Sequence, residues 1–468
     1  MQELWKHQQV GIERFCQAGG CFGFFFDVGT GKSRTAIESI RYLYNLEQKL
    51  VPTLIISPLI TLENWKREIL KFSKTQERDI VILHGSADKK KKLIANLLKN
   101  PNKIIIMNWE ALLSDYIYDY FTKNIPTILV GDELHYIKNH SSKRTKLALK
   151  LSKLVRYKIG LTGTPVLNSS EDLWSQLFFL DNGKRLGDKF HWFKAKYFYD
   201  KNAGMPSHVH FPDWVPHKDS NEKIKELISD ISMSVKKADC LDLPPLVREE
   251  VYVELGPDQT RAYKQMRDDF VTYVSDAACV ANLAITKALR LQQILSGYMP
   301  LDSGEVVHFS SNPRMAALSE LLTQYSGNHK IIVWAAFREN HKSIAKLCES
   351  LKIKYVMLTG EQSKIEKDQT MELFENDPQV RVCIGNQSVG IGVNLVSSSI
   401  SVYYSKGFNL AHDIQSEARN YRAGSERHES ITRYDLVSIG TIDEQVNQAL
   451  KDKKEIGAQL LKNFSVDL

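Results

Sequence analysis

The segment DVGTGKS, residues 27–33, directly follows the apolar run Phe22–Phe26 and leads into a helical pattern. A strand, a glycine-rich turn and a helix N-terminus together present backbone N–H groups and the positive end of a helix dipole to an anion. In such a turn Lys32 can reach the phosphates of a nucleotide, and the hydroxyl of Ser33 can bind Mg²⁺. The strict motif has a glycine where this chain has Phe26, but the flanking strand and helix favour phosphate binding over a turn without a ligand. The predicted phosphate-binding residues are Gly29, Thr30, Gly31, Lys32 and Ser33.

An acidic pair follows a second apolar run, Thr127–Val130, in the segment GDELH at residues 131–135. Acidic side chains at the carboxyl end of a parallel strand lie where ligands bind in open α/β sheets. A phosphate loop that hydrolyses a nucleotide needs a carboxylate to hold the metal and a second group to activate water. Asp132 fits the first role and Glu133 the second, with a polar helix cap as the alternative. Because the pair follows Lys32 on a later strand edge, it favours a site that hydrolyses ATP with Mg²⁺.

The elements that must position these loops are short apolar strands that alternate with helical patterns. In the first half, strands are predicted at Phe22–Phe26, Thr53–Ser57, Ile80–Leu83, Lys103–Met107, Thr127–Val130 and Tyr157–Leu161. Helical spacing fits Ser33–Tyr44 and Leu62–Phe72 between them. The second half repeats the scheme, with strands predicted at Lys330–Trp334, Lys354–Leu358, Val380–Ile384, Ile400–Tyr404 and Thr432–Val437. Apolar strands that alternate with helices indicate parallel sheets covered on both faces.

Between the two halves, Asp181–Pro313 is richer in proline and charge and lacks strand alternation. The segment Leu241–Leu246 (LDLPPL) contains two prolines and is the predicted crossing point. We therefore expect an α/β protein with two parallel-sheet lobes in tandem and helical insertions between them. The expected boundaries are 1–236 for the first lobe, with a helical protrusion at about 181–236, and 237–468 for the second, with a linker and helical insertion at about 237–312 and a core at 313–468.

Composition limits the class of protein. The chain has 468 residues, a formal net charge of +7, 43% hydrophobic residues and 25% charged residues, as in globular proteins rather than disordered, collagen-like or coiled-coil chains. No apolar run approaches the ~18–20 residues that span a bilayer, and the N-terminus MQELWKHQQ is too polar for a secretory signal. The six cysteines lack zinc-site spacing, so we expect Cys16 and Cys21 to be small buried residues.

These features lead us to expect a reduced, soluble, intracellular protein without a membrane partner, in the cytoplasm, the nucleoid or a virus-infected host cell. The mild positive charge permits a nucleic-acid partner but does not by itself argue for one.

The order of further motifs gives a family resemblance. Asp132–His135 (DELH) resembles the DExH box of superfamily 2 helicases, and Tyr136–Asn139 resembles the block that follows it in the SWI/SNF-related DNA translocases. Leu161–Asn168 (LTGTPVLN) and Glu171–Ser175 (EDLWS) resemble the third motif block of that family. The resemblance implies two RecA-like lobes with ATP·Mg²⁺ in the cleft between them and nucleic acid lying across them. It also implies that one loop couples hydrolysis to lobe movement, through Thr162, Gly163 and Thr164.

Other blocks in the first half extend the resemblance. Leu4–Gln8 resembles the N-terminal glutamine motif, in which Gln8 would recognise adenine. Leu54–Pro58 followed by Asn64–Glu68 resembles motif Ia, and two later loops stand where DNA-side loops are expected. The first-half residues for which the resemblance implies DNA contact are Ser57, Asn64, Trp65, His84, Gly85, Asn108 and Trp109.

Blocks in the second half complete the series. Lys330–Trp334 resembles motif IV, Gly385–Leu395 (GNQSVGIGVNL) resembles motif V and Gln415–Gly424 (QSEARNYRAG) resembles motif VI. In these blocks the resemblance implies DNA contact by Asn386 and Gly390, and a coupling role for Gly392 and Gln415. The chain departs from the family pattern at Asn386, Val389, Ile391, Ala418 and Ser425.

Motif VI contains two arginines, Arg419 and Arg422. Spaced three apart on an expected helix, they would share one face. Facing the phosphates from the second lobe, they would stabilise transition-state charge, a contribution of ~10³–10⁵ in rate for arginine fingers. A surface helix with two solvated arginines is the alternative, and the position within the whole motif series argues against it.

The resemblance implies an ATP-dependent translocase on double-stranded DNA, with ATP and Mg²⁺ as cofactors, that functions as a monomer. Two alternatives stay open: a DNA helicase that unwinds strands or remodels and anneals forks, and a DNA-binding interaction subunit whose ATP hydrolysis times assembly. The motifs of the second lobe exclude a small-molecule P-loop kinase. Because motor motifs use almost the whole chain, we expect a compact, motor-only member without a histone-reading module, suited to viral or bacterial repair, recombination or replication.

Two basic segments each have two interpretations. Lys189–Tyr199 (KFHWFKAKYFY) mixes basic and aromatic residues that could stack on bases. Phe190, Phe193 and Tyr197 fall on one helical stripe, however, so we expect a packing face. Lys89–Lys92 is expected to be a solvated helix face, with phosphate binding as the alternative.

Overall fold

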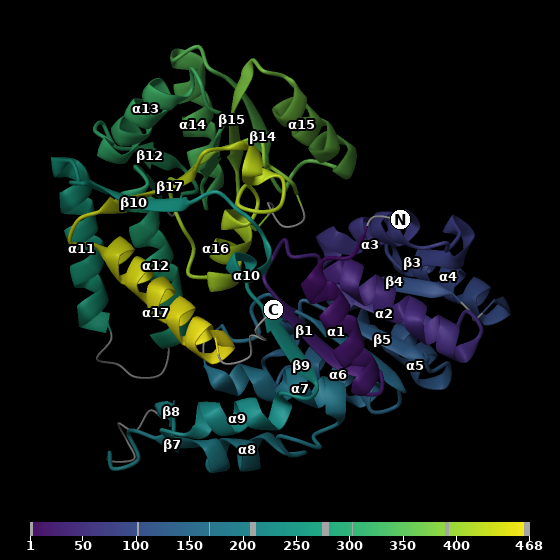
Figure 1. The fold of residues 1–468 in the computed structure, drawn as a ribbon. Coiled ribbons are helices and arrows are strands. Elements are labelled where there is room, and N and C mark those ends of the chain that lie inside the picture. Colours follow the sequence, from purple (N-terminus) through teal and green to yellow (C-terminus); the bar gives the residue numbers. More distant parts are fainter. Residues whose placement is uncertain are drawn as a thin grey trace. The chain divides into compact units, whose positions relative to one another are not determined.

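The computed structural model describes residues 3–100, 103–167, 169–205, 212–273, 280–301, 303–388 and 393–462. Figure 1 shows its ribbon and labels most of the helices and strands. The chain divides into two compact units, Met1–Leu241 with Lys453–Leu468 and Asp242–Asp452. The division falls at the start of the proline-containing segment Leu241–Leu246. Each unit contains its own parallel sheet, which confirms the expected α/β class with two parallel-sheet lobes.

The sheet of the first unit has seven strands in the order β3-β4-β2-β5-β6-β1-β9, and all its pairings are parallel. The strands are β1 (Cys21–Phe26), β2 (Thr53–Ser57), β3 (Ile80–Ile82), β4 (Ile104–Asn108), β5 (Ile128–Asp132), β6 (Tyr157–Leu161) and β9 (Ser232–Val235). Every residue of β2, β4, β5 and β6 is buried, as expected for parallel strands covered on both faces.

Helices cover both faces of this sheet. One hydrophobic core lies under α1 (Lys6–Gln17), α2 (Lys32–Glu47) and α3 (Leu62–Phe72). The other lies under α4 (Ala87–Lys99), α5 (Asp115–Lys123), α6 (Lys143–Ser152), α7 (Leu173–Asp181), α8 (Phe190–Tyr197) and α9 (Ser220–Ile228). Because side chains alternate along a strand, Ile55 of β2 belongs to the first core, whereas Leu54 and Ile56 belong to the second. A short antiparallel pair, β7 (Phe198–Asp200) and β8 (Trp214–Pro216), and the short helix α10 (Lys237–Cys240) complete the unit.

The sheet of the second unit has six strands in the order β10-β17-β16-β13-β15-β14, again all parallel. The strands are β10 (Leu246–Val253), β13 (Ile331–Trp334), β14 (Lys354–Leu358), β15 (Val380–Gly385), β16 (Ile400–Tyr403) and β17 (Ile431–Ser438). The helices are α11 (Pro257–Tyr273), α12 (Val280–Leu295), α13 (Pro313–Tyr325), α14 (Arg338–Ser350), α15 (Lys364–Asn376), α16 (Leu410–Glu417) and the first part of α17 (Ile442–Lys462), which from Lys453 on is counted with the first unit. An antiparallel pair joins β11 (Tyr298–Pro300) and β12 (Val306–His308).

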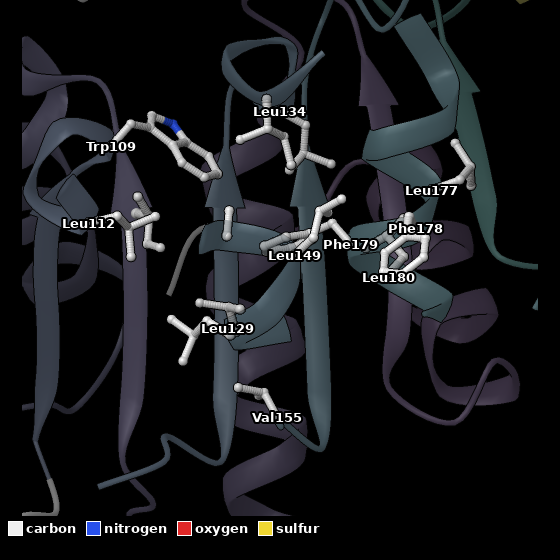
Figure 2. Packing of buried hydrophobic residues seen from close by; sticks show 14 of the residues in the cluster. Trp109, Leu112, Leu129, Leu134, Leu149, Val155, Leu177, Phe178, Phe179 and Leu180 are labelled. Carbon is white, nitrogen blue, oxygen red and sulfur yellow. The ribbon is translucent and has the colours of Figure 1, made fainter. Parts of the chain in front are cut away.

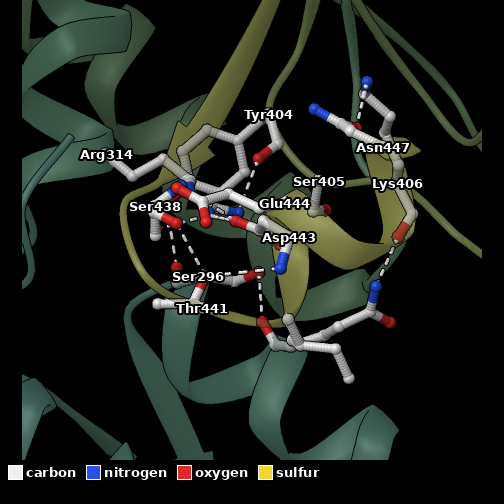
Figure 3. Close-up of polar contacts among 12 residues, drawn as sticks. Ser296, Arg314, Tyr404, Ser405, Lys406, Ser438, Thr441, Asp443, Glu444 and Asn447 are labelled. Atoms are coloured by element: carbon white, nitrogen blue, oxygen red, sulfur yellow. Dashed lines mark hydrogen bonds and ion pairs between the residues drawn. The ribbon is translucent and has the colours of Figure 1, made fainter. Parts of the chain in front are cut away.

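A buried arginine ties the start of α17 to this sheet (Figure 3). Arg314, which is 2% exposed, donates to the carbonyl oxygen of Tyr404 at 3.1 Å and to the hydroxyl of Ser438 at 2.7 Å. Its guanidinium also contacts the carboxylate of Asp443, which in turn accepts from the backbone N–H of Ser438 at 3.1 Å. The arginine thereby links α13, the end of β17 and the first turn of α17.

Every strand predicted in the two halves is present, with its ends shifted by at most two residues. No strand was predicted within Asp181–Pro313, but β7 to β12 lie there. The strand β9 is only SMSV, too short to show a period. The strand β10 lies at a sheet edge, where exposed charged residues in LVREEVYV interrupt the apolar pattern. Within the described ranges, no helix has both the length and the apolarity needed to cross a membrane.

Candidate active site

Three loops emerge side by side at the carboxyl edge of the first unit's sheet. Strand β6 lies between β5 and β1, so the acidic pair after β5, the Thr162–Thr164 loop after β6 and the phosphate loop after β1 are neighbours. Their spacing is tight: a Cβ added to Gly163 would lie 3.2 Å from the carbonyl oxygen of Phe26 and 3.3 Å from Nζ of Lys32. The sheet order therefore brings together the three motifs that the sequence assigns to nucleotide chemistry.

The phosphate loop forms the open turn that its glycines predict. Gly29 and Gly31 have φ angles of 92° and 83°, which glycine adopts without the strain that a Cβ would add. The ammonium of Lys32 donates to two carbonyl oxygens of the turn at 2.9 and 3.3 Å. Thr30 is fully buried, and Ser33 lies half-buried in the first turn of α2. Lys32 therefore lies over the turn, where a bound phosphate would meet it.

Two polar side chains at the start of α1 hold this loop. His7, in its neutral form with a proton on Nε2, donates to the carbonyl oxygen of Thr30 at 2.8 Å. Gln8 donates from Nε2 to the carbonyl oxygen of Gly31 at 3.2 Å and accepts from the backbone N–H of Trp5 at 3.0 Å. Burial lowers the pKa of His7, and its hydrogen bond to Thr30 opposes that shift. Because both ends of the Gln8 amide are engaged, adenine recognition by this residue would require an exchange of partners.

Asp132 is buried at the end of β5 between two tryptophans. Burial and the neighbouring Glu133 raise its pKa to about 7, while the hydrogen bond from Trp65 and the charge of Lys32 oppose this rise. Trp65 donates from Nε1 to Oδ2 of Asp132 at 2.8 Å. Trp109 donates from Nε1 to the main-chain oxygen of Asp132 at 2.9 Å. One indole therefore holds the carboxylate and the other holds its backbone.

The sequence placed Trp65 and Trp109 among the DNA-contact residues. The structure buries both indoles, at 2% and 0% exposure, so neither ring offers a face for stacking. The hydrogen bonds of these two indoles to Asp132 were not predicted. A linear residue pattern does not show which buried acceptor an indole N–H will contact.

Glu133 adopts a backbone conformation that is unusual for a residue with a side chain. Its φ is 54°, and such strained positions cluster at functional sites. Its carboxylate lies 3.2 Å from Nδ1 of His135, and the same nitrogen lies 3.4 Å from the hydroxyls of both Thr162 and Thr164. The backbone N–H of Thr164 also donates to the hydroxyl of Thr162 at 3.1 Å. His135 thus connects the acidic pair with the loop after β6.

Leu134 fixes the position of this acidic segment by packing on the sheet (Figure 2). A Cβ added to Gly131 would lie 2.7 Å from Cδ2 of Leu134, and one added to Gly160 would lie 2.4 Å from its Cδ1. Both strands therefore need glycine at these positions for the leucine to lie so close. With Leu134 buried, the side chains on either side of it stay at the sheet edge.

The donor set fits magnesium held with a nucleotide. Across the described part of the chain, no cluster of three or more His, Cys, Asp or Glu side chains could hold a metal alone. The site offers the hydroxyl of Ser33 and the carboxylate of Asp132. Mg²⁺ keeps several waters and usually takes one or two protein oxygens together with substrate phosphates. The residues present match that mode of binding.

The other first-unit residues with an expected DNA contact differ in exposure. His84 and Gly85 are exposed, Asn64 is half-buried, and Ser57 and Asn108 are buried. Asn64 donates to Glu68 at 3.1 Å, and Asn108 donates to Glu110 at 2.8 Å.

In the second unit, motif VI ends its helix earlier than expected. Helix α16 stops at Glu417, so Arg419 and Arg422 do not share a helical face, and that expectation is wrong. The carbonyl oxygen of Arg419 accepts from the N–H of Leu395 in motif V at 3.0 Å instead of continuing the helix. The guanidinium of Arg419 is 4% exposed and donates to the carbonyl oxygens of Gln415 at 2.7 Å and Val393 at 3.2 Å. Arg422 is half-buried.

Motif V is described only in part. Gly390 and Gly392 lie outside the described residues. Asn386 donates to the carbonyl oxygen of Ala336 at 3.0 Å and accepts from the backbone N–H and hydroxyl of Ser388 at 2.9 and 2.7 Å. It therefore shapes the turn that follows β15.

A buried ionic cluster beside motif VI was missed from the sequence. The guanidinium of Arg433, 3% exposed, lies 2.6 Å from Asp413, 3.0 Å from Glu417 and 3.0 Å from Asp435. Its Cζ also lies 3.8 Å from the ring centroid of Tyr403. The signal was present, because positions 413 and 417 share a helix face and positions 433 and 435 share a strand face.

Comparisons with known proteins agree with the family resemblance of the sequence. A family model described as the SNF2-related domain matches residues 8–302, and one described as the helicase conserved C-terminal domain matches residues 313–424. An uncharacterised ATP-dependent helicase of Mycoplasma genitalium is 25% identical over 97% of this chain and 42% of its own. A putative ATP-dependent helicase/translocase of Bacillus subtilis is 24% identical over 93% of this chain and 46% of its own. The chain thus spans less than half the length of these two relatives.

Among solved structures, the SWI2/SNF2 ATPase core of Sulfolobus solfataricus in complex with dsDNA is 25% identical, with a TM-score of 0.45, and the match covers 99% of this chain and 97% of that chain. The SNF2-related model alone matches more than half of this sequence. The chain therefore belongs to the SNF2-related family, with a helicase C-terminal domain after the SNF2-related domain.

Proposed function

We propose that this chain hydrolyses ATP with Mg²⁺ and uses the cycle to move along double-stranded DNA. The observation that carries the proposal is the meeting of Lys32, Asp132 and the Glu133–His135–Thr162 contacts at one sheet edge of an SNF2-related chain. A phosphate-binding lysine, a metal-binding carboxylate and an oriented base are the parts that phosphoryl transfer to water requires.

The phosphate loop binds the nucleotide in this proposal. Lys32 exchanges its two carbonyl partners for phosphate oxygens, a stronger pairing because both groups are charged. Ser33 and Asp132 hold Mg²⁺, which neutralises phosphate charge when it is bound. Gln8 recognises adenine after releasing Gly31 or Trp5.

Glu133 orients the attacking water and takes its proton. Its carboxylate is held by His135, so the base does not need to be ordered at the moment of reaction. The same histidine reaches Thr162 and Thr164, and Gly163 lies against Lys32. A change at the phosphates can therefore reach the Thr162–Thr164 loop directly, which supports a coupling role for this loop.

Arg419 and Arg422 have separate tasks. Arg422 supplies positive charge to the phosphates during turnover, while Arg419 braces motif V against motif VI through Val393 and Leu395. Gly392 of motif V and Gln415 of motif VI are proposed to couple hydrolysis to lobe movement. Asn386 and Gly390 of motif V are proposed to contact DNA.

The DNA substrate is supported by the family and by the motif order. The Bacillus subtilis relative is named as a helicase/translocase, and the motif blocks resemble those of SWI/SNF-related DNA translocases. Among the first-unit residues expected to contact DNA, His84 and Gly85 are exposed and Asn64 is half-buried, whereas the others are buried. Backbone N–H groups of short loops can bind phosphates without a broad basic face.

The test compares ATP turnover with no nucleic acid and with duplex, single-stranded, forked DNA and RNA. We expect duplex DNA to stimulate turnover most, with Lys32→Ala and Glu133→Gln both inactive. Equal turnover with and without any nucleic acid would favour a subunit whose hydrolysis merely times assembly. Undiminished hydrolysis in either variant would sink the assignment of the site.

Movement along the duplex is tested by displacement of a triplex-forming strand. We expect ATP-dependent displacement from a blunt duplex, with no release of either duplex strand. Release of a duplex strand from a forked substrate would instead support a strand-unwinding helicase, and displacement only on single strands would contradict duplex translocation.

A further inference from the structure

A cavity of about 410 Å³ lies in the first unit between α6, α7 and the start of α8. None of the residues that line it belongs to the phosphate loop, the acidic pair or the Thr162–Thr164 loop. Its volume is in the range of small-molecule sites, about 300–1,000 Å³. We call it the α6–α8 pocket.

The floor of the pocket is aromatic. Trp174 and Phe178 of α7 line it and are almost fully buried, whereas Phe190 at the start of α8 is half-buried. The ring of His140 stacks on that of Phe190, with centroids 3.6 Å apart and planes at 17°. Burial, followed by the charges of Lys194 and Lys146, lowers the pKa of His140, so the stack is uncharged at neutral pH.

The rim of the pocket is positive and lacks acidic residues. Lys146, Lys150, Lys153 and Lys189 line it, and no Asp or Glu does. All four lysines are exposed, and within the described ranges none of them forms an ion pair with a carboxylate. Lys153 lies with Nζ 5.1 Å from the ring centroid of Phe178. The rim therefore carries positive charge that the protein itself does not neutralise.

Three of these lysines form a row: Lys146 and Lys150 lie on α6, and Lys153 is the residue that caps its C-terminus. Their spacing of four and then three residues places them on one helical face, over a length of about 10 Å at 1.5 Å per residue. One strand of B-form nucleic acid carries a charge about every 3.4 Å along its axis, so the row could serve about three phosphates. A free nucleotide would instead need the lysines grouped around its single phosphate group, not spread along a row.

An aromatic floor with a positive rim fits one ligand chemistry best. An acidic peptide would use the lysines but leave the aromatic stack unused, whereas a nucleotide offers a flat base to the rings and phosphates to the ammonium groups. A further ring extends the surface beyond the pocket, since Trp192 of α8 is 64% exposed. The segment Lys189–Tyr199 was interpreted either as a packing face or as a base-stacking surface. Phe193 and Tyr197 are buried in the core, whereas Lys189, Phe190 and His191 line the pocket.

We propose that the α6–α8 pocket binds an unpaired nucleotide of a nucleic-acid strand, with its base against the aromatic lining and the neighbouring phosphates along the row of lysines. Such a site goes beyond movement along a duplex. It directs the protein to substrates that contain unpaired nucleotides, such as forks and gaps. The binding step needs no ATP, so it can be tested apart from hydrolysis.

The test measures binding of the full chain to a short fluorescein-labelled oligothymidylate by fluorescence anisotropy, without ATP or Mg²⁺. Phe190→Leu keeps apolar volume but removes the ring, and we expect it to raise the dissociation constant about 10-fold, within the range measured for loss of one stacked base. Lys146→Ala/Lys150→Ala should reduce the slope of log affinity against log salt by about 0.7 for each lost phosphate contact. The matched control is Lys99→Ala/Lys123→Ala, which removes two exposed lysines of α4 and α5 outside the pocket and should change the affinity less than 2-fold.

Each comparison has an outcome that overturns the proposal. Equal losses in the control pair, or equal losses for a blunt duplex of the same length, would mean that the lysines act only as general charge. Displacement of the labelled strand by deoxythymidine monophosphate at equal nucleotide concentration would mean that the pocket holds a free nucleotide instead. Displacement by polyglutamate at equal charge would mean that it holds an acidic peptide.

A second measurement on the unaltered protein covers the case in which a pocket variant fails to fold. An oligonucleotide containing 4-thiothymidine is photo-crosslinked to the full chain, and the modified peptide is identified by mass spectrometry. We expect the crosslink within residues 189–192 or at His140. Crosslinks confined to other parts of the chain overturn the proposal, whatever the variants do.

Discussion

The indole Nε1 of Trp65 donates a 2.8 Å hydrogen bond to Oδ2 of Asp132, and both side chains are buried. Trp65 lies on α3, which follows the loop after β2 where DNA contact was expected, whereas Asp132 is the proposed metal ligand. A donor that occupies one carboxylate oxygen leaves the other oxygen to face a cation, and such supporting contacts tune metal affinity. Helix α3, which follows the expected DNA-side loop, therefore holds the carboxylate that is proposed to bind the metal.

Trp65→Phe keeps the ring and removes the donor, so it should raise the Mg²⁺ concentration needed for half-maximal ATP turnover by about 10-fold or more, as for other supporting residues of metal sites. The measurement is ATPase rate against Mg²⁺ at saturating ATP. The matched control is Trp109→Phe, which loses a similar buried hydrogen bond, but to the main-chain oxygen of Asp132. Equal shifts in Mg²⁺ requirement in the two variants would mean that both indoles serve only the fold.

His135 offers a second test, because it contacts Glu133 and the Thr162–Thr164 loop at once. His135→Ala should lower the maximal ATPase rate by about 10²-fold, typical for loss of a properly held base, while changing the Michaelis constant for ATP much less. The ratio of the ATPase rates with and without duplex DNA should also fall, because the DNA-stimulated rate should decrease by a larger factor than the basal rate. A variant that keeps this ratio would show that the histidine plays no part in coupling.

The parts of the site that could be predicted from the sequence are those fixed by short segments. The turn at Gly29–Ser33 and the acidic pair at Asp132 each depend on a strand, a loop and their local residue types, so they were found together with nearly all of the central strands. Contacts between segments that are distant in the sequence are not predicted by any local residue pattern. Neither the indole N–H of Trp65 nor the imidazole N–H of His7 could be paired with its acceptor from spacing alone.

Two other differences have simple physical causes. Helix α16 ends at Glu417: the guanidinium of Arg419 takes the carbonyl oxygen of Gln415, while the backbone N–H of Arg419 bonds to Ser416. The carbonyl oxygen of Arg419 accepts from Leu395 in motif V, a contact between distant segments that helical spacing does not predict. Strand β10 was not predicted, because an edge strand exposes part of its length and charged residues such as Arg248 and Glu250 interrupt its apolar pattern.

The buried imidazole of His7 should make stability depend on pH. Burial lowers the folded-state pKa of His7 from its ordinary value of 6.5. Just below pH 6.5, His7 is therefore protonated in the unfolded chain but still neutral in the folded chain. Stability is therefore unaffected well above that value and falls as the pH drops through about 6.5. His7→Gln keeps a donor near Thr30 without a titrating group. We expect its urea midpoint to decline less than that of the unaltered protein between pH 7.5 and 5.5. Parallel declines in the two proteins would show that His7 does not contribute.

The cluster around Arg433 gives a test of stability in the second unit. Three carboxylates, from Asp413, Glu417 and Asp435, surround this guanidinium. Removing one member of a buried ion cluster leaves the others uncompensated, which typically costs about 3–5 kcal/mol. Arg433→Met should lower the free energy of unfolding by about that amount, measured by urea denaturation at pH 7.5. The matched control, Arg427→Met, breaks an ion pair with Glu375 whose arginine side chain is 45% exposed, and should cost no more than about 1 kcal/mol.

The pH dependence of that loss separates charge from packing. Burial alone would raise the pKa of Asp435, but Arg433 and then Lys406 hold it below its ordinary value. A depressed carboxyl pKa adds stability above the ordinary value and loses it as the pH falls. Without Arg433 the buried carboxylate of Asp435 takes up a proton at higher pH, which reduces the repulsion within the cluster. The stability difference between Arg433→Met and the unaltered protein should therefore shrink steadily from pH 7.5 toward pH 4. A difference that stays constant over this range would assign the loss to the arginine's packing on Tyr403, 3.8 Å away, rather than to its charge.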